Sequence, residues 1–161
     1  MEIDLNKIQP LSKFIIPHIG LTTFKYRGKA SSILKKAKAD ITIDQFIILK
    51  LLSLYGSLTQ QETAEILYKD KSNLSRMIDA LEEKGYISRL VDVKNKRIVK
   101  VLNITEKGLI YAEKATLIAE KLHNSAMQGI TDEEKETIKR VMKKIRDNLD
   151  KEIEVCELWK S

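Results

Sequence analysis

The chain has 161 residues, and 29 Lys and Arg against 23 Asp and Glu give a formal net charge of +6. Hydrophobic residues make up 43% and charged residues 32%, which is too apolar for a disordered chain and too charged for a membrane protein. The single cysteine excludes an intrachain disulfide and a cysteine-based zinc site. The sequence has neither an apolar run of the ~18 residues that a spanning helix needs nor a signal-peptide core. We therefore expect one compact, mostly helical, cytoplasmic protein without a membrane segment.

Residues suited to catalysis are scarce. The two histidines, His18 and His123, lie far apart and belong to no metal-binding pattern. The glycine-rich motifs that cradle phosphate do not occur in the sequence, and neither does the Gly-x-Ser-x-Gly turn of serine hydrolases. Acidic residues alternate with lysine and arginine along helical stretches, which is typical of a solvated surface. The sequence therefore predicts that the protein is not an enzyme and has no cofactor and no metal site.

The N-terminal part predicts two helices. Pro17 suits the first turn of a helix over about 17–38, because its missing N–H is not needed there. Thr42 then opens a second helix, whose apolar run over 46–52 is too rich for an exposed face. This helix should be buried and should end at Gly56, in a left-handed C-cap.

Two further helices follow closely. Thr59 and Glu62 form a capping box, which predicts a short helix that starts after Thr59 and runs to about Leu67. Asp70 is a good N-cap for another helix over 71–84, and Gly85 is its natural stop. The apolar residues of that helix recur at i, i+3, i+4 and i+7, on one stripe: Leu74, Met77, Ile78 and Leu81. Its opposite face is polar: Ser72, Asn73, Ser75, Arg76 and Asp79.

The composition then changes to that of a β-hairpin. Residues 86–91 and 98–104 have strand composition, and the polar stretch 92–97 between them forms the tip. From Arg89 to Lys100 there are five basic residues against one aspartate, a local charge of +4. A basic hairpin after a polar-faced helix indicates a winged helix-turn-helix, in which the helix enters the major groove of duplex DNA and the hairpin reaches a neighbouring groove or the backbone.

This arrangement predicts which residues contact DNA. Short polar side chains in the N-terminal half of the 71–84 helix allow close approach, and an arginine there can reach a guanine edge or a phosphate. The groove contacts are Ser72, Asn73, Ser75 and Arg76. The wing contacts are Lys94, Lys96 and Arg97. Thr59 and Gln60 could contact the DNA backbone. Taken alone, the helix residues could equally be a solvated outer face.

The two ends of the chain predict an interface between copies. Thr105 opens a helix to about residue 127, and a capping box at Thr131 opens a last helix to about Leu158. At about 27 residues the last helix would be roughly 40 Å long. An apolar stripe follows it: Ile138, Val141, Met142, Ile145, Leu149, Ile153 and Cys156. A second copy would bury this stripe and that of the 17–38 helix, whereas a monomer would have to fold both helices back into a bundle. Burial on the stripe would keep the Cys156 thiol inert rather than redox-active.

Four segments in the middle of the chain match the pattern of a known family. They are Ile41-Thr42-x-x-Gln45, Leu58-Thr59-Gln60-x-Glu62-x-Ala64, Leu81-Glu82-x-x-Gly85-Tyr86-Ile87-x-Arg89 and Ile104-Thr105-Glu106-x-Gly108. Together they resemble the MarR family of bacterial winged-helix transcription regulators. Arg97 matches the arginine that this family most often places in the minor groove, although Asn95 stands where the family usually has aspartate. The stretch 97–105 is one residue longer than usual, which predicts a β-bulge in the second wing strand.

The resemblance implies a mainly α fold with a small β-wing, a winged helix-turn-helix flanked by long N- and C-terminal dimerisation helices. Residues 1–40 would form an N-terminal arm and dimerisation helix, 41–108 the DNA-binding domain, and 109–161 the C-terminal dimerisation helices. The implied function is a sequence-specific DNA-binding transcriptional regulator, a homodimer on a pseudo-palindromic operator in double-stranded DNA.

The resemblance also implies a repressor that a small, often aromatic, effector releases from DNA. Four polar or aromatic residues could line the effector site, with ordinary packing or surface exposure as the alternative for each: His18, Tyr26, Arg27 and Tyr111. Two other functions remain open for a winged helix, namely an architectural nucleic-acid-binding protein and a protein-interaction module without operator specificity.

Overall fold

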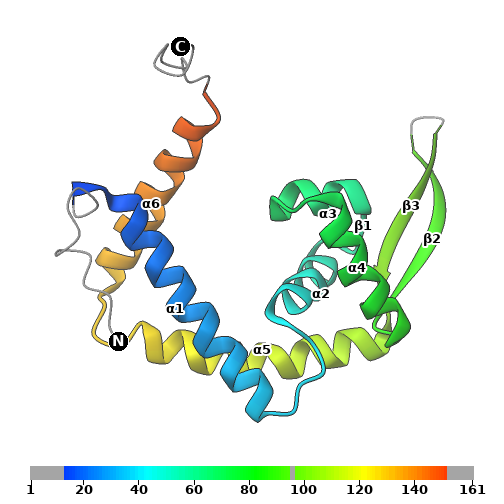
Figure 1. The fold of residues 1–161 in the computed structure, drawn as a ribbon, viewed down its shortest axis with the longest axis horizontal. Coiled ribbons are helices and arrows are strands. Elements are labelled where there is room, and N and C mark those ends of the chain that lie inside the picture. The colour runs from blue at the N-terminus through cyan, green and yellow to red at the C-terminus, as the bar shows by residue number, and fades with distance from the viewer. Residues whose placement is uncertain (1–12, 95–96, 152–161) are drawn as a thin grey trace, which may run out of the picture. The chain divides into compact units, whose positions relative to one another are not determined.

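The computed structural model describes residues 13–94 and 97–151, without side-chain positions for residues 93, 94 and 97. In chain order the elements are α1 (Ile15–Lys36), α2 (Ile43–Tyr55), β1 (Ser57–Thr59), α3 (Gln60–Leu67), α4 (Lys71–Glu83), β2 (Ile87–Lys94), β3 (Arg97–Ile104), α5 (Glu106–Ala126) and α6 (Asp132–Leu149) (Figure 1). The chain forms two compact units, and the boundary falls between Leu122 and His123. The first unit is a winged helix-turn-helix with a small antiparallel sheet, which confirms the mainly α fold with a β-wing.

Side-chain caps set the start of most helices, as the sequence predicts. Thr42, Thr59 and Thr131 each form a capping box with the residue three positions later. The Asp70 carboxylate caps α4 by accepting the backbone N–H of Asn73 at 2.7 Å. These contacts satisfy N–H groups that have no partner inside the helix.

One helix end differs from its prediction in detail. Gly56 is the C-cap of α2, but its φ of 79° and ψ of −83° lie outside the left-handed helical region. The chain turns sharply there because β1 begins at the next residue. Glycine accommodates this backbone, which a side chain would disfavour.

The sheet has the strand order β1-β3-β2, with both pairs antiparallel. β2 and β3 pair one-to-one from Ile87↔Ile104 to Lys94↔Arg97. The predicted β-bulge is therefore wrong, because no residue of the described ladder is left unpaired. The predicted tip at 92–97 is also too long: backbone pairing carries the strands out to Lys94 and back from Arg97 in spite of their polar side chains. β1, which pairs with β3, has no counterpart in the sequence-based prediction.

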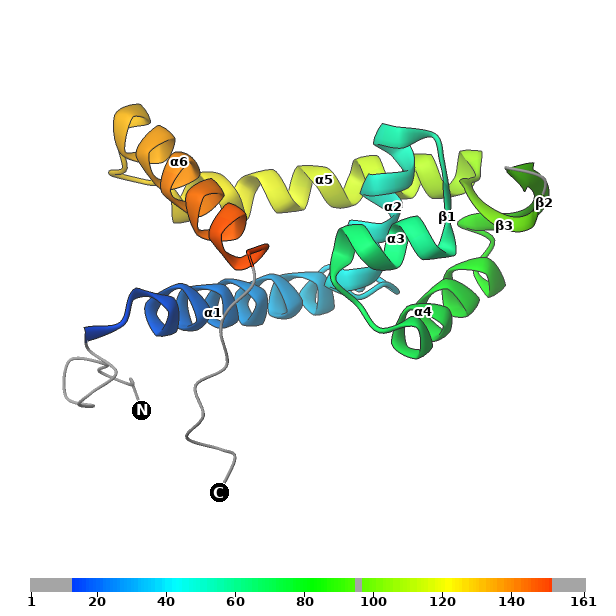
Figure 2. The same ribbon diagram turned by 90° about the horizontal axis from the view of Figure 1, so that it is seen from above.

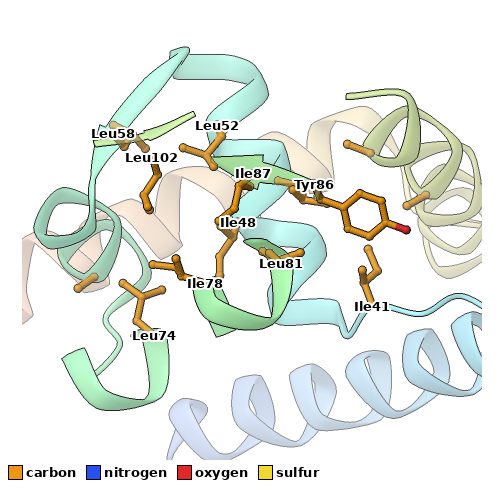
Figure 3. Close-up of a cluster of buried hydrophobic side chains, with 14 residues drawn as sticks. Ile41, Ile48, Leu52, Leu58, Leu74, Ile78, Leu81, Tyr86, Ile87 and Leu102 are labelled. Atoms are coloured by element: carbon orange, nitrogen blue, oxygen red, sulfur yellow. The ribbon is translucent and has the colours of Figure 1, made fainter. Parts of the chain in front are cut away.

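The core of the first unit lies between α2, α4 and the sheet (Figure 3). Seven of its side chains are 0% exposed: Ile48, Leu49, Leu52, Leu74, Ile78, Leu81 and Leu102. Three of them form the predicted inner stripe of α4, while Met77 on the same stripe is half-buried. Since burying such a side chain fully is worth about 1.5–3 kcal/mol, this stripe fixes which face of α4 points outward.

α5 begins at the root of the wing, directly after β3 (Figure 2). There it packs against the turn between α4 and β2. The Thr105 hydroxyl accepts the Gly108 N–H at 3.0 Å and donates to the Gly85 carbonyl at 2.8 Å. A Cβ at Gly108 would lie 2.0 Å from the Tyr86 carbonyl oxygen, so only glycine fits this position without a shift.

α6, in the second unit, lies wholly within the described residues and has no buried residue. Its exposed apolar side chains include Ile138, Val141 and Leu149. The predicted end at Leu158 is wrong, since α6 ends at Leu149 with Asp150 as its C-cap. An aspartate is unfavourable at the negative end of the helix dipole, which weakens the last turn there. Ile153 and Cys156 of the predicted stripe lie outside the described residues. Throughout the described part of the chain, no helix combines the length and the apolar character that crossing a membrane requires.

Candidate nucleic-acid interface

The outer face of α4 carries the four predicted groove residues. Ser72 and Arg76 are exposed, while Asn73 and Ser75 are half-buried along the same part of the helix. They occupy the first two turns, next to an N-terminus whose free N–H groups and dipole favour an anion. Lys71, the first residue of α4, is also exposed. The fold therefore presents short polar groups and two positive charges at the N-terminal end of α4, a helix whose opposite face is buried in the core.

Arg89 of β2 joins the wing to α4. Its guanidinium donates to the Asp79 and Glu82 carboxylates, and its backbone N–H donates to Glu82 at 3.1 Å. Burial would lower the pKa of Arg89, but the two carboxylates outweigh that effect and hold the pKa above its ordinary value. The charge of Arg89 is therefore compensated within the protein, and the wing offers DNA less positive charge than its composition suggests. Sequence reasoning did not assign this role, although two acidic residues three positions apart on a helix face are a usable signal.

Two of the predicted wing contacts, Lys94 and Arg97, lie at the far end of the β2–β3 ladder. The backbones of Lys94 and Arg97 form its last pair. The side chains of Lys94 and Arg97, and the whole of Lys96, lie outside the described residues.

The predicted backbone contacts are at the start of α3. The Thr59 hydroxyl accepts the Glu62 N–H at 3.1 Å, so one of its two lone pairs is used in the cap. Its hydrogen is still available to a phosphate. Gln60 is half-buried as the first residue of α3. Both residues thus lie at a helix N-terminus, without the full exposure of Ser72.

Asp44, in the first turn of α2, connects α1 to the turn of the helix-turn-helix. It forms ion pairs with Arg27 of α1 at 2.9 Å and with Lys69, between α3 and α4, at 3.4 Å. Burial would raise the pKa of Asp44, but Arg27 and Lys69 lower it below the usual value. The ion pair between Lys69 and Asp44 therefore ties the turn that precedes α4 to the first turn of α2.

Asp40, between α1 and α2, forms a second connection at the other end of α4. Its backbone N–H donates to the Tyr111 hydroxyl at 3.0 Å, and its carboxylate accepts from the Tyr86 hydroxyl at 3.2 Å. Lys84 donates to its carbonyl. Burial would raise the pKa of Asp40, but these tyrosines and Lys84 outweigh burial and lower it. Burial and the nearby Asp40 charge raise the pKa of Tyr86 to about 12.

The predicted effector residues do not form one cluster. Tyr26 lines an apolar cavity of about 150 Å³ whose walls come from α1, α2 and α5. Arg27 is paired with Asp44. Tyr111 is hydrogen-bonded to Asp40, and its ring packs against that of Tyr86 at a tilt of 36°, with 4.6 Å between the ring centroids. His18 is half-buried near the start of α1 and does not line this cavity. Sequence reasoning missed the other walls, which are aliphatic or aromatic residues and mostly half-buried: Ala30, Ile33, Leu34, Ile43, Phe46, Ile47, Ala115, Ile118, Ala119 and Leu122.

Solved structures share this architecture. The crystal structure of a mutant MarR from E. coli in complex with operator DNA has a TM-score of 0.71 and 28% sequence identity, covering 89% of this chain and 99% of that chain. The S. aureus MepR–DNA complex has a TM-score of 0.72 and 26% identity, covering 82% of this chain and 94% of that chain.

Sequence comparisons lead to the same family. Residues 41–99 match the sequence model of the MarR family. The chain is 31% identical over 106 residues to the multiple antibiotic resistance protein MarR of Escherichia coli, covering 66% of this chain and 74% of that protein. It is 32% identical over 115 residues to the HTH-type transcriptional regulator YybA of Bacillus subtilis, covering 71% of this chain and 76% of that protein. On the winged-helix geometry and these matches together, the chain belongs to the MarR family.

Proposed function

We propose that this chain is a transcriptional regulator that binds double-stranded DNA sequence-specifically through residues 41–108. The observation that carries the proposal is the two-sided character of α4. Leu74, Ile78 and Leu81 are fully buried, whereas Ser72 and Arg76 are exposed at the N-terminal end. The helix is therefore held by the core on one side and is free to enter a groove on the other. The similar MarR and MepR structures are of complexes with DNA, which supports the same use here.

We assign base recognition to Asn73 and Arg76. A side-chain amide pairs with adenine and a guanidinium with guanine in the major groove, while Ser72 and Ser75 allow the backbone to approach closely. Lys94, Lys96 and Arg97 would hold the wing on the adjacent groove or backbone, and Thr59 and Gln60 would contact phosphates near the start of α3. An enzymatic role has no support in these contacts.

A homodimer is the assembly that this proposal requires. α6 exposes Ile138, Val141 and Leu149, while Phe24 of α1 and Phe14 at its N-cap are also exposed. A second copy would cover such apolar surface, through the helices in 1–40 and 109–161. Two-fold symmetry then places two α4 helices on half-sites about 10 base pairs apart, so the operator is a near-palindrome.

The cavity lined by Tyr26 is the best-supported effector site. Its volume of about 150 Å³ and its apolar walls suit a small aromatic molecule, since an apolar cavity of that size can bind benzene. A ligand releases the protein from DNA if it binds more tightly to the dimer conformation in which the spacing of the two DNA-binding domains does not fit DNA. Ala30→Leu should fill the cavity, and it should abolish thermal stabilisation by benzene while DNA binding is kept.

Selection of bound sequences from a random duplex pool tests the function. The expected result is a two-fold motif of ~15–20 base pairs, with Asn73→Ala or Arg76→Ala relaxing preference at one position per half-site by about 1–3 kcal/mol. Arg97→Ala should weaken binding, whereas Arg140→Ala on α6 is a matched control that should not. Binding without an enriched motif would indicate an architectural protein, and no binding would indicate a protein-interaction module.

The salt dependence of binding is a second measure. If each subunit neutralises about four phosphates, the logarithm of affinity should fall against the logarithm of salt concentration with a slope near −7. A flat response would contradict the electrostatic part of the proposal.

A further inference from the structure

Tyr68 ends α3 with a backbone conformation that its side chain disfavours. Its φ of 48° and ψ of 44° lie in the left-handed region. Its N–H donates to the Glu65 carbonyl at 3.2 Å, and the Lys69 N–H donates to Ala64 at 3.0 Å, which closes the helix. Glycine adopts this conformation freely, whereas a Cβ crowds the following carbonyl. The turn itself therefore requires nothing that a tyrosine supplies.

The Tyr68 side chain also contributes little to the core. At 86% exposure it is the most exposed large hydrophobic side chain among the described residues. The two residues after it are committed to the fold: Lys69 pairs with Asp44 at 3.4 Å, and Asp70 caps α4. The turn is thus anchored by its neighbours while the ring of Tyr68 is held out in solvent, an outlier for which a function is the natural explanation.

Tyr68 lies three residues before the first residue of α4, whose N-terminal half carries the proposed groove contacts. Exposed Lys71 follows it on the same approach to the helix. We propose that Tyr68 is a DNA-contacting residue that donates its phenol hydroxyl to a backbone phosphate at the edge of the groove that α4 enters. This inference rests on the proposed function. Tyrosine is among the side chains that make such phosphate contacts, which set the register of the protein on the duplex.

An uncharged donor to phosphate has a distinctive signature. It carries no sequence information, so its loss weakens binding equally on every duplex. It releases no counterion, so its loss leaves the salt slope unchanged. Asn73→Ala should instead weaken binding only to the selected duplex, and Lys71→Met should reduce the salt slope by about one per subunit.

The test uses the full chain with two duplexes, one selected from the random pool and one of scrambled sequence and equal length. Tyr68→Phe removes only the hydroxyl, and it should weaken binding to both duplexes by about tenfold or more at an unchanged salt slope. Tyr68→Gly should weaken binding at least as much while raising the urea midpoint, because it relieves the left-handed backbone. Weaker binding together with higher stability cannot come from damage to the fold.

Wild-type affinity of Tyr68→Phe and Tyr68→Gly for both duplexes would overturn the inference, as would a loss confined to the selected duplex. Arg76→Ala, measured on the same duplexes, separates the two possible failures. If Arg76→Ala binds weakly and the Tyr68 variants bind normally, only the Tyr68 contact is refuted. If all of these variants bind like the wild type, the proposed use of α4 fails as well.

Discussion

Replacing Gly108 with alanine should destabilise the protein, although alanine is the better helix former. Gly108 is a buried residue in the first turn of α5. A Cβ there would lie 2.0 Å from the Tyr86 carbonyl oxygen and 3.0 Å from Cγ1 of Ile104. The same carbonyl accepts the Thr105 N–H at 3.1 Å, so it cannot move away without losing that bond.

The magnitude follows from two opposing effects. In an open helix, glycine to alanine gains about 1 kcal/mol. Real Cβ atoms essentially never come within 3.0 Å of such a heavy atom, and the Cβ at residue 108 would lie 2.0 Å from the Tyr86 oxygen. α5 and the root of the wing must therefore separate by about 1 Å. Overpacking of this kind costs typically 1–3 kcal/mol, and a strained or lost hydrogen bond at Thr105 adds about 1 kcal/mol. We expect a net loss of about 2 kcal/mol in the free energy of unfolding.

Urea denaturation at fixed protein concentration measures this change. Gly20→Ala and Gly28→Ala in α1 are matched controls, because within the described residues no atom beyond the local helix backbone lies within 4 Å of a Cβ at either position. Both should gain about 0.5–1 kcal/mol, so the same substitution should have opposite signs in α1 and α5. A Gly108→Ala variant as stable as the wild type would refute the close approach of α5 to Tyr86.

Three further predictions concern charged and phenolic groups. Arg89→Met should lower the free energy of unfolding by about 1 kcal/mol, because it removes the guanidinium that pairs with Asp79 and Glu82. In the same urea denaturation, Arg89→Lys should restore only part of the lost stability, because an ammonium cannot replace the forked guanidinium contact. Because the pKa of Asp44 is lowered in the folded state, Asp44 contributes to the free energy of unfolding. This contribution is complete above the unfolded pKa of about 3.9 and is lost as pH falls through the folded pKa. Urea midpoints between pH 5 and pH 2 should therefore fall less steeply in Arg27→Met than in the wild type, and equal slopes would count against this ion pair. Because the pKa of Tyr86 is raised to about 12, the contribution of Tyr86 to the free energy of unfolding is complete below its unfolded pKa of about 10. This contribution is lost as pH rises toward 12. Absorbance titration should show one tyrosine ionising near pH 12 that Tyr86→Phe lacks, and an unchanged titration curve would contradict the contact with Asp40.

The helix starts could be predicted because each depends on groups within four residues of one another. The hydroxyl of Thr42, Thr59 or Thr131 bonds the N–H three positions later, whatever the rest of the chain does. The inner stripe of α4 was equally predictable, since a helical period alone places Leu74 and Ile78 on one face. The exposed positions of Ser72 and Arg76 follow from the same period.

The remaining features depend on partners that are distant in the sequence. β1 is only three residues long and shows no periodicity, and it is a strand only because β3 pairs with it. The length of the wing depends on backbone pairing between β2 and β3, which side-chain composition does not report. Of the four effector candidates, Tyr26 alone lines the apolar cavity. The other lining residues could not be predicted, because the walls of the cavity come from three separate helices.

By itself, the sequence of this protein determined which segments are helical, which face of α4 is buried and which polar residues that helix presents. The tertiary structure alone decided that Arg89 is neutralised by α4, and that Asp40 meets Tyr111, which lies 71 positions away. The physical reason is that capping and amphipathic periodicity act within a few residues of the chain. Ion pairs, strand pairing and cavities instead arise between segments that only the folded core brings within bonding distance.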